Sequence, residues 1–377
     1  MQPKQTRRWV LYGSASCIAI ICARRAEWRL PGSSTDRSRV TCRSTSPSVP
    51  SPPLAPPPPA DEHLRPLSFE QTAPRDLVHR WAVGEVLLTD WIRLGPHRFK
   101  VGAQWPRGHN FYGPVGGFWH DPLLAAESIR QASSLVSHVF YDLPRDHPTL
   151  MTDLSFTLCP DALRLGPRPV DVELTIEGTG VKLHGGRLAG MTMEVGLARG
   201  DVALGHGRMT FNCMRRSVYR RLRGSYAEIP VSLPDQPAPL PPCQVGRTTE
   251  ADVVLGLSPA GHDQAHPDEG VWPLCVNWAH PTLFDHPTDH VPGMLLLEAA
   301  RQAAHRLAGP GTVLTPMMAG RFHRYVEFDS PCLVRARLLT TGTGGREVQV
   351  AAEQNGAIAY ECLLTAHRVP LSSRGER

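Results

Sequence analysis

The chain of 377 residues contains no Cys-x-x-Cys pair, and its nine cysteines are scattered and odd in number. This distribution argues against a disulfide framework or a zinc site and favours free thiols in a reducing compartment. The chain also lacks a long hydrophobic run, because the moderately apolar stretch 9–23 is too short and too polar to span a bilayer. Arg24 and Arg25 follow that stretch without a convincing cleavage site, which disfavours an export signal. We therefore expect a cytoplasmic protein that does not associate with membranes.

The formal net charge of +5 comes from the N-terminal residues, and most of the chain has no excess of positive charge. Residues 1–65 contain ten Lys and Arg against four Asp and Glu, so residues 66–377 carry a net charge of −1. A body without net positive charge offers no overall electrostatic attraction for a phosphate backbone. We expect no nucleic-acid partner.

Proline is abundant, by contrast, and two proline-rich segments divide the chain. Eight prolines lie among residues 47–59, and six lie among residues 230–242. The first segment cannot bury enough apolar surface to become ordered, whereas the second is typical of a stiff linker. The predicted organisation is a disordered extension at 1–70, a first domain at 71–224, a linker at 225–243, a second domain at 244–370 and a tail at 371–377.

One short sequence occurs twice. Residues 123–131 (LLAAESIRQ) and 294–302 (MLLLEAARQ) both contain an apolar run, then Glu, then Arg three residues later and Gln four residues later. Upstream, residues 77–88 line up without gaps with residues 244–255. The offsets of 171 and 167 residues predict two copies of one unit of roughly 130–150 residues.

Each predicted unit follows the same plan. A short strand (84–88 or 252–255) leads through a Gly-, Pro- and His-rich stretch to an apolar helix (122–141 or 292–307). The strands expected after the helices are 170–177, 187–197 and 202–212 in the first unit, and 333–340, 347–353 and 357–367 in the second. Residues 199–201 and 354–356 have the composition of hairpin turns. Strands that follow one long helix predict an antiparallel sheet packed on that helix, an α+β domain.

Both predicted helices place three polar side chains on one face. The two sets are Glu127, Arg130 and Gln131, and Glu298, Arg301 and Gln302. Glu and Arg at this spacing are often a surface ion pair. The flanking Leu and Ala residues leave little solvated face, however, which favours charges that are paired or that line a cavity.

The second helix begins at Pro292-Gly293, where unpaired backbone amides favour developing negative charge. A thioester carbonyl at Gly293 would be polarised there as in an oxyanion hole. Glu298 is a candidate general base or hydroxyl ligand, particularly if burial raises its pKa. Arg301 could pair with Glu298, or it could hold a phosphate or carboxylate.

The motif Pro-Gly-x-Leu-x-x-Glu-Ala-x-x-Gln at 292–302 resembles the central helix of hot-dog-fold acyl-thioester dehydratases. Residues 75–370 resemble the A-factor biosynthesis protein family more closely. The matching sequences are EVLLTDW (85–91), VGAQWP (101–106), YRRLRG (219–224) and FDHPTDHVPG (284–293). The resemblance implies two tandem hot-dog domains, each an antiparallel sheet wrapped around a central helix. They would form an intramolecular pseudo-dimer with an acyl pocket at the junction.

The same resemblance implies an acyltransferase. It would move a β-ketoacyl group from acyl carrier protein to the hydroxyl of dihydroxyacetone phosphate, on the way to γ-butyrolactone signals. The expected catalytic residues are Glu298, Glu127 and Arg301, and the expected substrate-binding residues are Gly293, Gln302, Arg130, Gln131 and His286. Glu127 is either a second catalytic group or a relic of duplication. No metal or cofactor of its own is expected, since phosphopantetheine arrives on the carrier.

The sequence also departs from the dehydratase pattern. Those enzymes carry a catalytic His eight residues before the Pro of Pro-Gly, where this chain has Phe284 and, in its first copy, Gly113. His286 becomes equivalent only after a two-residue deletion. Acyl transfer to a bound hydroxyl needs only a base and a polarised carbonyl, so the missing His favours transfer over dehydration. A dehydratase, a thioesterase and a non-catalytic acyl- or lactone-binding protein remain alternatives.

Three further features have open interpretations. His280, His286 and His290 stand near Asp285 and Asp289, but their spacing fits a pocket mouth better than a metal site. In the first copy, Asp121-Pro122 replaces Pro-Gly, and residues 109–112 with His120 contact either substrate or their own loop. A basic run could dock the acidic carrier protein or form a solvated edge. It comprises Arg215, Arg216, Arg220 and Arg221, followed by Arg223.

Overall fold

The computed structural model describes residues 65–258, 268–342 and 345–369. The predicted tail at 371–377 and all but the last six residues of the predicted extension at 1–70 lie outside these ranges. Arg65 and Ser68 hold the start of the described chain against the sheet. Both donate hydrogen bonds to the carboxylate of Asp90, at 2.5 Å from Arg65 Nη1 and 2.8 Å from the Ser68 amide.

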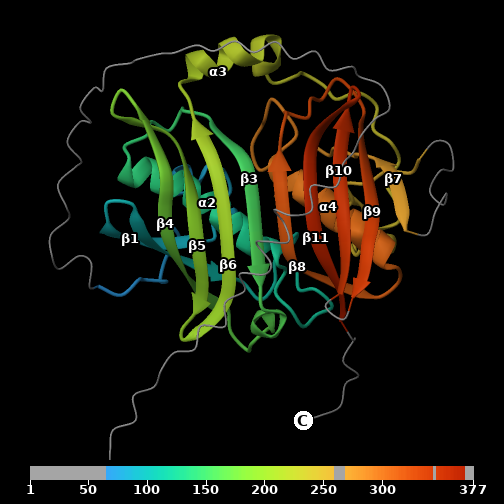
Figure 1. Ribbon diagram of the computed structural model, residues 1–377, viewed down its shortest axis with the longest axis horizontal. Coiled ribbons are helices and arrows are strands. Elements are labelled where there is room, and N and C mark those ends of the chain that lie inside the picture. Colours follow the sequence, from blue (N-terminus) through green and yellow to red (C-terminus); the bar gives the residue numbers. More distant parts are fainter. Residues whose placement is uncertain (1–64, 259–267, 343–344, 370–377) are drawn as a thin grey trace, which may run out of the picture. The chain divides into compact units, whose positions relative to one another are not determined.

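The described strands form one sheet of eleven strands, all paired antiparallel, in the order β1-β2-β4-β5-β6-β3-β8-β11-β10-β9-β7 (Figure 1). The first half supplies β1 Leu88–Gly95, β2 Arg98–Trp105, β3 Thr149–Leu158, β4 Val170–His184, β5 Arg187–Arg199 and β6 Val202–Cys213. The second half supplies β7 Glu269–Pro273, β8 Thr312–Phe322, β9 Cys332–Gly342, β10 Gly345–Gln354 and β11 Ala357–Val369. The halves meet edge to edge where β3 pairs with β8, from Asp153 opposite Arg321 to Thr157 opposite Met317.

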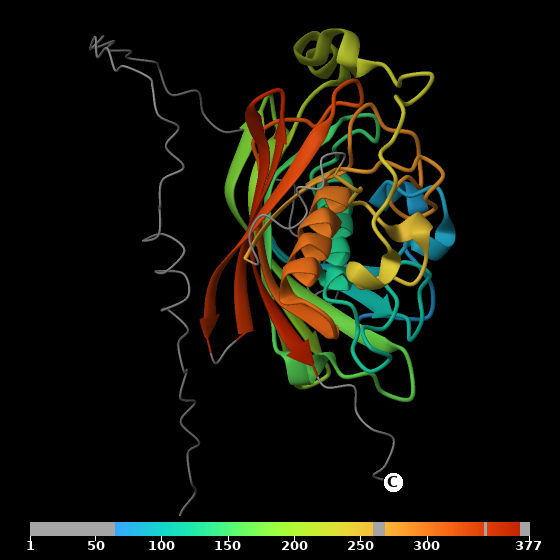
Figure 2. The same cartoon turned by 90° about the vertical axis from the view of Figure 1, so that its right-hand side faces the viewer.

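Helices α2 Leu123–Phe140 and α4 Gly293–Ala308 lie on the same side of this sheet (Figure 2). Almost every side chain of both helices is buried, since the sheet covers one side and loops with short 3-10 turns cover the other. A helix that is mostly apolar all round has this environment. The prediction of an α+β fold with two tandem hot-dog domains is confirmed.

The expected strands at 84–88 and 252–255 are wrong. Instead, 3-10 turns form at η3 Val83–Glu85 and η7 Glu250–Asp252, and β1 begins only at Leu88. In the first segment the carbonyl of Leu87 accepts from the Gln104 amide of β2 at 2.9 Å, and a helix side chain makes two further backbone hydrogen bonds. The amide of Leu87 donates to Gln131 Oε1 at 3.0 Å, and Gln131 Nε2 donates to the carbonyl of Glu85 at 2.8 Å.

The two predicted hairpin turns are confirmed. Arg199 pairs with Val202 across the β5–β6 turn, and Gln354 pairs with Ala357 across the β10–β11 turn. In the second turn Asn355 and Gly356 both have positive φ, 52° and 72°. Asn-Gly favours this turn because both residues adopt positive φ at little cost.

The residues that connect the two halves form short helices and pack on both halves. Helix α3 Arg216–Arg223 continues into η5 Gly224–Ala227, and η6 Pro242–Gln244 ends the predicted linker. Within that linker Leu240 is buried, and its amide donates to the carbonyl of Leu255 at 2.9 Å. In the described ranges, no helix has the length and apolar content needed to cross a membrane.

Candidate active site

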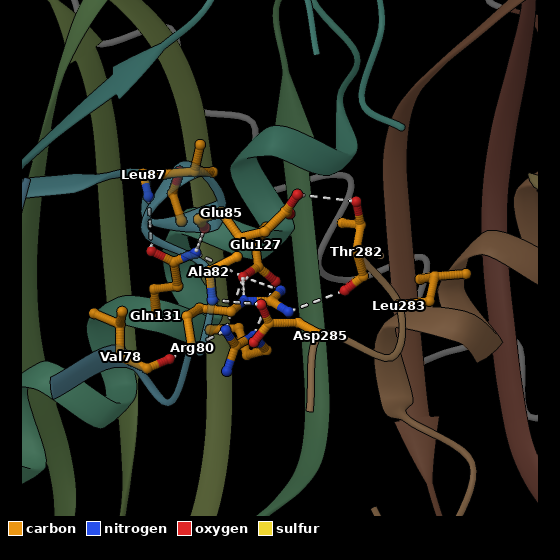
Figure 3. A network of polar contacts seen from close by, with 12 residues as sticks. Val78, Arg80, Ala82, Glu85, Leu87, Glu127, Gln131, Thr282, Leu283 and Asp285 are labelled. Carbon is orange, nitrogen blue, oxygen red and sulfur yellow. Dashed lines mark hydrogen bonds and ion pairs between the residues drawn. The ribbon is translucent and has the colours of Figure 1, made fainter. Parts of the chain in front are cut away.

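Glu127 lies at the centre of a buried polar network on α2 (Figure 3). Arg80 donates to its Oε1 from Nη2 at 2.5 Å. Arg130, one turn along the helix, donates to Oε2 from Nε at 2.9 Å and to Oε1 from Nη2 at 2.7 Å. Gln131 Nε2 donates to the same Oε1 at 2.7 Å. Two guanidinium groups and one amide therefore hold a single carboxylate.

The second half repeats this network around Glu298 on α4, whose side chain is fully buried. Arg247 donates from Nε to Oε1 at 2.9 Å, and its Nη2 forms an ion pair with Oε2 at 2.7 Å. Arg301 donates from Nε to Oε2 at 2.8 Å and from Nη2 to Oε1 at 2.6 Å. Gln302 Nε2 donates to Oε1 at 2.5 Å. The predicted Glu-Arg-Gln triad is thus a tetrad with an added arginine.

The two arginines of each network together keep the glutamate ionised. Burial raises the pKa of Glu298, but the guanidinium groups of Arg247 and Arg301 outweigh burial and bring the pKa to about 2. Burial likewise raises the pKa of Glu127, and Arg130 and Arg80 lower it to about 2. The condition for a general base, a Glu298 pKa raised by burial, is therefore not met beside Arg247 and Arg301.

Gln131 and Gln302 connect their glutamates to the chain that crosses above each helix. Gln302 Oε1 accepts from the amide of Val254 at 3.0 Å, and its Nε2 also donates to the carbonyl of Asp252 at 2.8 Å. Gln131 makes the equivalent pair of bonds to Leu87 and Glu85. These side chains, predicted to bind substrate, are fully engaged with protein partners in this structure.

Each added arginine also bonds the opposite half of the chain. Arg80 Nη1 donates to the carbonyl of Thr282 at 3.0 Å, as Figure 3 shows, and Arg247 Nη1 donates to the carbonyl of Phe111 at 2.5 Å. Thr282 and Phe111 occupy equivalent positions, 171 residues apart, in the loops before α4 and α2. The two networks therefore hold the two halves together.

The loop histidines shape these crossing segments. His109 Nδ1 accepts from the amides of Phe111 and Tyr112, both at 3.1 Å. His280 Nδ1, at the equivalent position, accepts from the amides of Thr282 and Leu283 at 3.1 and 3.0 Å. For His109, of the two interpretations of loop packing and substrate contact, the structure shows loop packing, and His280 has the same role in its own loop.

The other predicted histidines lie outside these hydrogen-bonded loop turns. His286 is half-buried, and its Nδ1 lies 3.3 Å from Asp285 Oδ2; burial lowers its pKa. His290 Nδ1 lies 2.6 Å from Asp289 Oδ1. Among the described residues, no group of three or more His, Cys, Asp and Glu side chains is arranged to hold a metal ion.

A cavity of about 470 Å³ opens beside the Glu298 network. The first half contributes the loop before α2, and the second half contributes residues around η6, α4 and the start of β8. Its ionisable lining consists of Arg247, Arg301, His305, Asp252 and Asp121. The cavity lies between the two halves, at the junction where the sequence predicts a pocket.

Gly293, the expected carbonyl-binding position, is not among the residues that line this cavity. A Cβ atom on Gly293 would lie 2.6 Å from Met151 Cε and 3.2 Å from a ring atom of Phe322, so little space remains there. The helix N-terminus at the cavity is that of α2, through Asp121. Gly113, which stands where dehydratases carry their catalytic His, also lines the cavity.

Small residues line the cavity beside the Glu298 network. Gly113, Gly246 and Thr248 line it. At the first site, the equivalent positions carry Phe284, His79 and Trp81. His79 Nε2 lies 2.7 Å from His138 Nε2, so this pair occupies the space next to the Glu127 network. The duplicated networks are alike, but their surroundings are not.

The basic run divides into two parts on α3, at the top of Figure 1. Arg215, Arg216, Arg220 and Arg221 are exposed, and Val218 and Leu222 are exposed between them. Arg223 is buried instead: it pairs with Glu327 and donates to the carbonyl of Asp289 at 3.0 Å. Arg223 therefore fixes the helix to the second half.

Three site residues were missed by sequence reasoning: Arg80, Arg247 and Asp121. Arg80 and Arg247 occupy the same position in the gap-free alignment of 77–88 with 244–255, so that identity was an available signal. The only sequence signal for Asp121 was that Asp121-Pro122 stands in the first copy where the second copy has Pro292-Gly293.

The chain was compared with known proteins. The model of the A-factor biosynthesis hotdog domain matches residues 63–215 and 230–370. A 2-oxo-3-(phosphooxy)propyl 3-oxoalkanoate synthase of Streptomyces virginiae is 42% identical over 294 residues, which cover 78% of this chain and 97% of the relative. A protein of the same name from Streptomyces coelicolor is 39% identical over 297 residues, covering 78% and 92%. Among solved structures, a 12:0-ACP thioesterase from Umbellularia californica has 10% identity and a TM-score of 0.43, covering 72% of this chain and 94% of that one.

Proposed function

We infer the activity of this chain from its family, because the chain belongs to the A-factor biosynthesis hotdog domain family. The product in the name of its relatives is an ester between a 3-oxo acid and dihydroxyacetone phosphate. The chain is accordingly an acyltransferase that places a 3-oxoacyl group on the hydroxyl of dihydroxyacetone phosphate. The observation that carries this conclusion is 42% identity over 97% of a relative with that name.

We propose acyl carrier protein as the donor, with the acyl group carried on its phosphopantetheine thiol. The exposed arginines of α3 support this donor, since a positive surface complements an acidic carrier and speeds its encounter. The chain needs no metal or cofactor of its own in this reaction. A cytoplasmic location follows from a cytoplasmic donor and remains a prediction.

The cavity beside Glu298 is the proposed reaction site. Glu298 pairs with Arg301 and Arg247 and stays ionised at neutral pH, since its pKa is about 2. A carboxylate of such low pKa is a poor base, so its proposed role is to orient the two guanidinium groups rather than to deprotonate the acceptor. Arg301 and Arg247 line the cavity, where they can bind the acceptor phosphate or the oxyanion formed at the thioester carbon. Holding both substrates in one cavity supplies much of the rate.

The test is mass spectrometry of the products that the purified full chain forms from a 3-oxoacyl carrier protein and dihydroxyacetone phosphate. We expect an acceptor-dependent phosphorylated ester from the wild-type chain and a strong loss of it in Glu298→Gln. Free acid without acceptor would replace the transferase with a thioesterase, and an enoyl thioester would replace it with a dehydratase. If the chain binds the acyl group tightly without turnover, and Glu298→Gln binds it with the same affinity, the chain would be a non-catalytic binding protein.

A further inference from the structure

Asp121 and Asp252 are the two carboxylates that line the cavity beside the Glu298 network. Asp252 is engaged by His280 and Thr249, and their hydrogen bonds outweigh burial and lower its pKa, so Asp121 is the carboxylate of interest.

Asp121 comes from the first half of the chain, just before α2, at the position that Pro292 occupies before α4. Its side chain is almost fully buried, with 2% of the residue exposed, and it lines the cavity with Arg301 and Arg247. Within the described residues, its only side-chain hydrogen bond runs from the Leu123 amide to Oδ1 at 2.9 Å. Oδ2 is therefore without a hydrogen-bond partner in that part of the chain.

Asp121 differs from the nearby Glu298 in its environment. All the partners of Glu298 are cations or amides that hold it ionised. Burial raises the pKa of Asp121, although the charges of Arg301 and Arg247 and the Leu123 amide oppose that rise, and the charge of Glu298 adds to it. A carboxylate with a raised pKa and a free oxygen is the better proton acceptor.

We propose that Asp121 is the general base of this cavity and accepts the proton of the acceptor hydroxyl. The proposal rests on the transferase reaction proposed above. The hydroxyl oxygen bonds to the thioester carbonyl carbon while its proton passes to Asp121, and the carbon–sulfur bond then breaks. The leaving thiolate takes the proton from Asp121, so the products are an ester and a free thiol, and the carboxylate is regenerated.

This assignment explains two differences from the dehydratase pattern. Gly113 stands where dehydratases carry their catalytic His, so the cavity lacks that base. Asp121, which follows in the same loop, provides a carboxylate in the cavity instead. The first site has no such group at the equivalent position, because Pro292 stands there. One half therefore provides the base, and the other provides the arginines.

His305 is the rival base because it lines the same cavity. Burial and the charge of Arg301 lower its pKa to about 4, and a neutral imidazole could in principle take the same proton. Substitution separates the two. His305→Gln keeps the size of the side chain roughly constant but removes the basic nitrogen, while Asp121→Asn keeps the Oδ1 acceptor for the Leu123 amide.

The experiment measures ester formation by the full chain from a 3-oxoacyl carrier protein and dihydroxyacetone phosphate across pH 4–9. We expect Asp121→Asn to lower kcat by about 100-fold or more, with little change in KM or melting temperature. The acidic limb of the wild-type kcat profile should be absent in Asp121→Asn. Asp121→Glu should recover part of the rate. Asp161→Asn, at an exposed acid of the same half, is the matched control and should behave as wild type.

Retention of kcat and of the acidic limb in Asp121→Asn, with ester still formed by the wild type, would refute Asp121 as base and leave the transferase intact. Loss of that limb in His305→Gln but not in Asp121→Asn would assign the proton to His305 instead. Failure of the wild-type chain to form ester would overturn the transferase itself, and the proposed step with it.

Discussion

At the scale of single residues, each buried glutamate is more important for charge balance than for proton transfer. Removing the charge of Glu298 leaves the guanidinium groups of Arg247 and Arg301 buried without a counterion. Breaking a buried pair in this way costs about 3–5 kcal/mol. We expect Glu298→Gln to lower the free energy of unfolding by about that amount and to reduce ester formation at least 100-fold, measured by denaturant titration and product analysis.

Glu127→Gln is the matched variant, because its network has the same composition. We expect a similar loss of stability but a loss of activity at least tenfold smaller than in Glu298→Gln, since the cavity lies at the other network. Equal losses of activity in the two variants, after correction for the folded fraction, would show that both sites react.

The low glutamate pKa values also predict how stability depends on pH. A carboxylate whose pKa is about 2 when folded and 4.5 when unfolded stabilises the folded chain above pH 4.5. That contribution, on the order of 3 kcal/mol for each glutamate, is lost as the pH falls from 4.5 to 2. We expect the free energy of unfolding to fall over this window, and to fall less steeply in Glu298→Gln than in the wild type. Parallel curves for the two proteins would contradict the assigned pKa.

At the scale of elements, α3 presents charge on one side and is anchored on the other. Arg223 and Tyr219 bond the loop residues Glu327 and Asp289, while Arg216, Arg220 and Arg221 are exposed. We expect the triple substitution of these three exposed arginines by Glu to raise KM for the acyl carrier protein at least tenfold. The rate with a small acyl-pantetheine thioester should not change. Measured KM values at two salt concentrations check this, because a docking surface weakens with salt and a solvated edge does not.

The elements also show what sequence patterns can predict. The buried helices and the β5–β6 and β10–β11 hairpins were predictable, because Glu-Arg-Gln spacing and turn residues are local signals. Strand β8 was missed, since it contains Pro316 and Gly320. Pro316 falls at the register shift between the pairs Met317–Thr365 and Leu314–His367, and such irregular positions are where a strand tolerates proline. The sequence of β8 alone does not show this register shift, which becomes apparent only from its pairing with β11.

At the scale of the whole molecule, the site could be predicted only in part. The sequence places Glu298, Arg301 and Gln302 together, because they share a helix face. The bond from Arg247 to Phe111 joins residues 136 positions apart, and Asp121 reaches the cavity only because the two halves face each other. No local pattern encodes these contacts. The duplication was visible, whereas the difference between the two sites depends on which small residues surround each network.

The contacts between the halves make a further prediction about folding. Strands β3 and β8 join the halves in one sheet, and Arg80 and Arg247 each bond a loop carbonyl across the junction while neutralising a buried glutamate. Unfolding one half would therefore expose the β3 or β8 edge and leave the other half with an incomplete network. We expect denaturant to unfold the two halves in a single transition, detected coincidently by tryptophan fluorescence and circular dichroism. Glu127→Gln, in the first half, should shift that whole transition to lower denaturant, as Glu298→Gln does from the second. Two resolved transitions, with each variant moving only one of them, would instead describe two independent domains that merely share a chain.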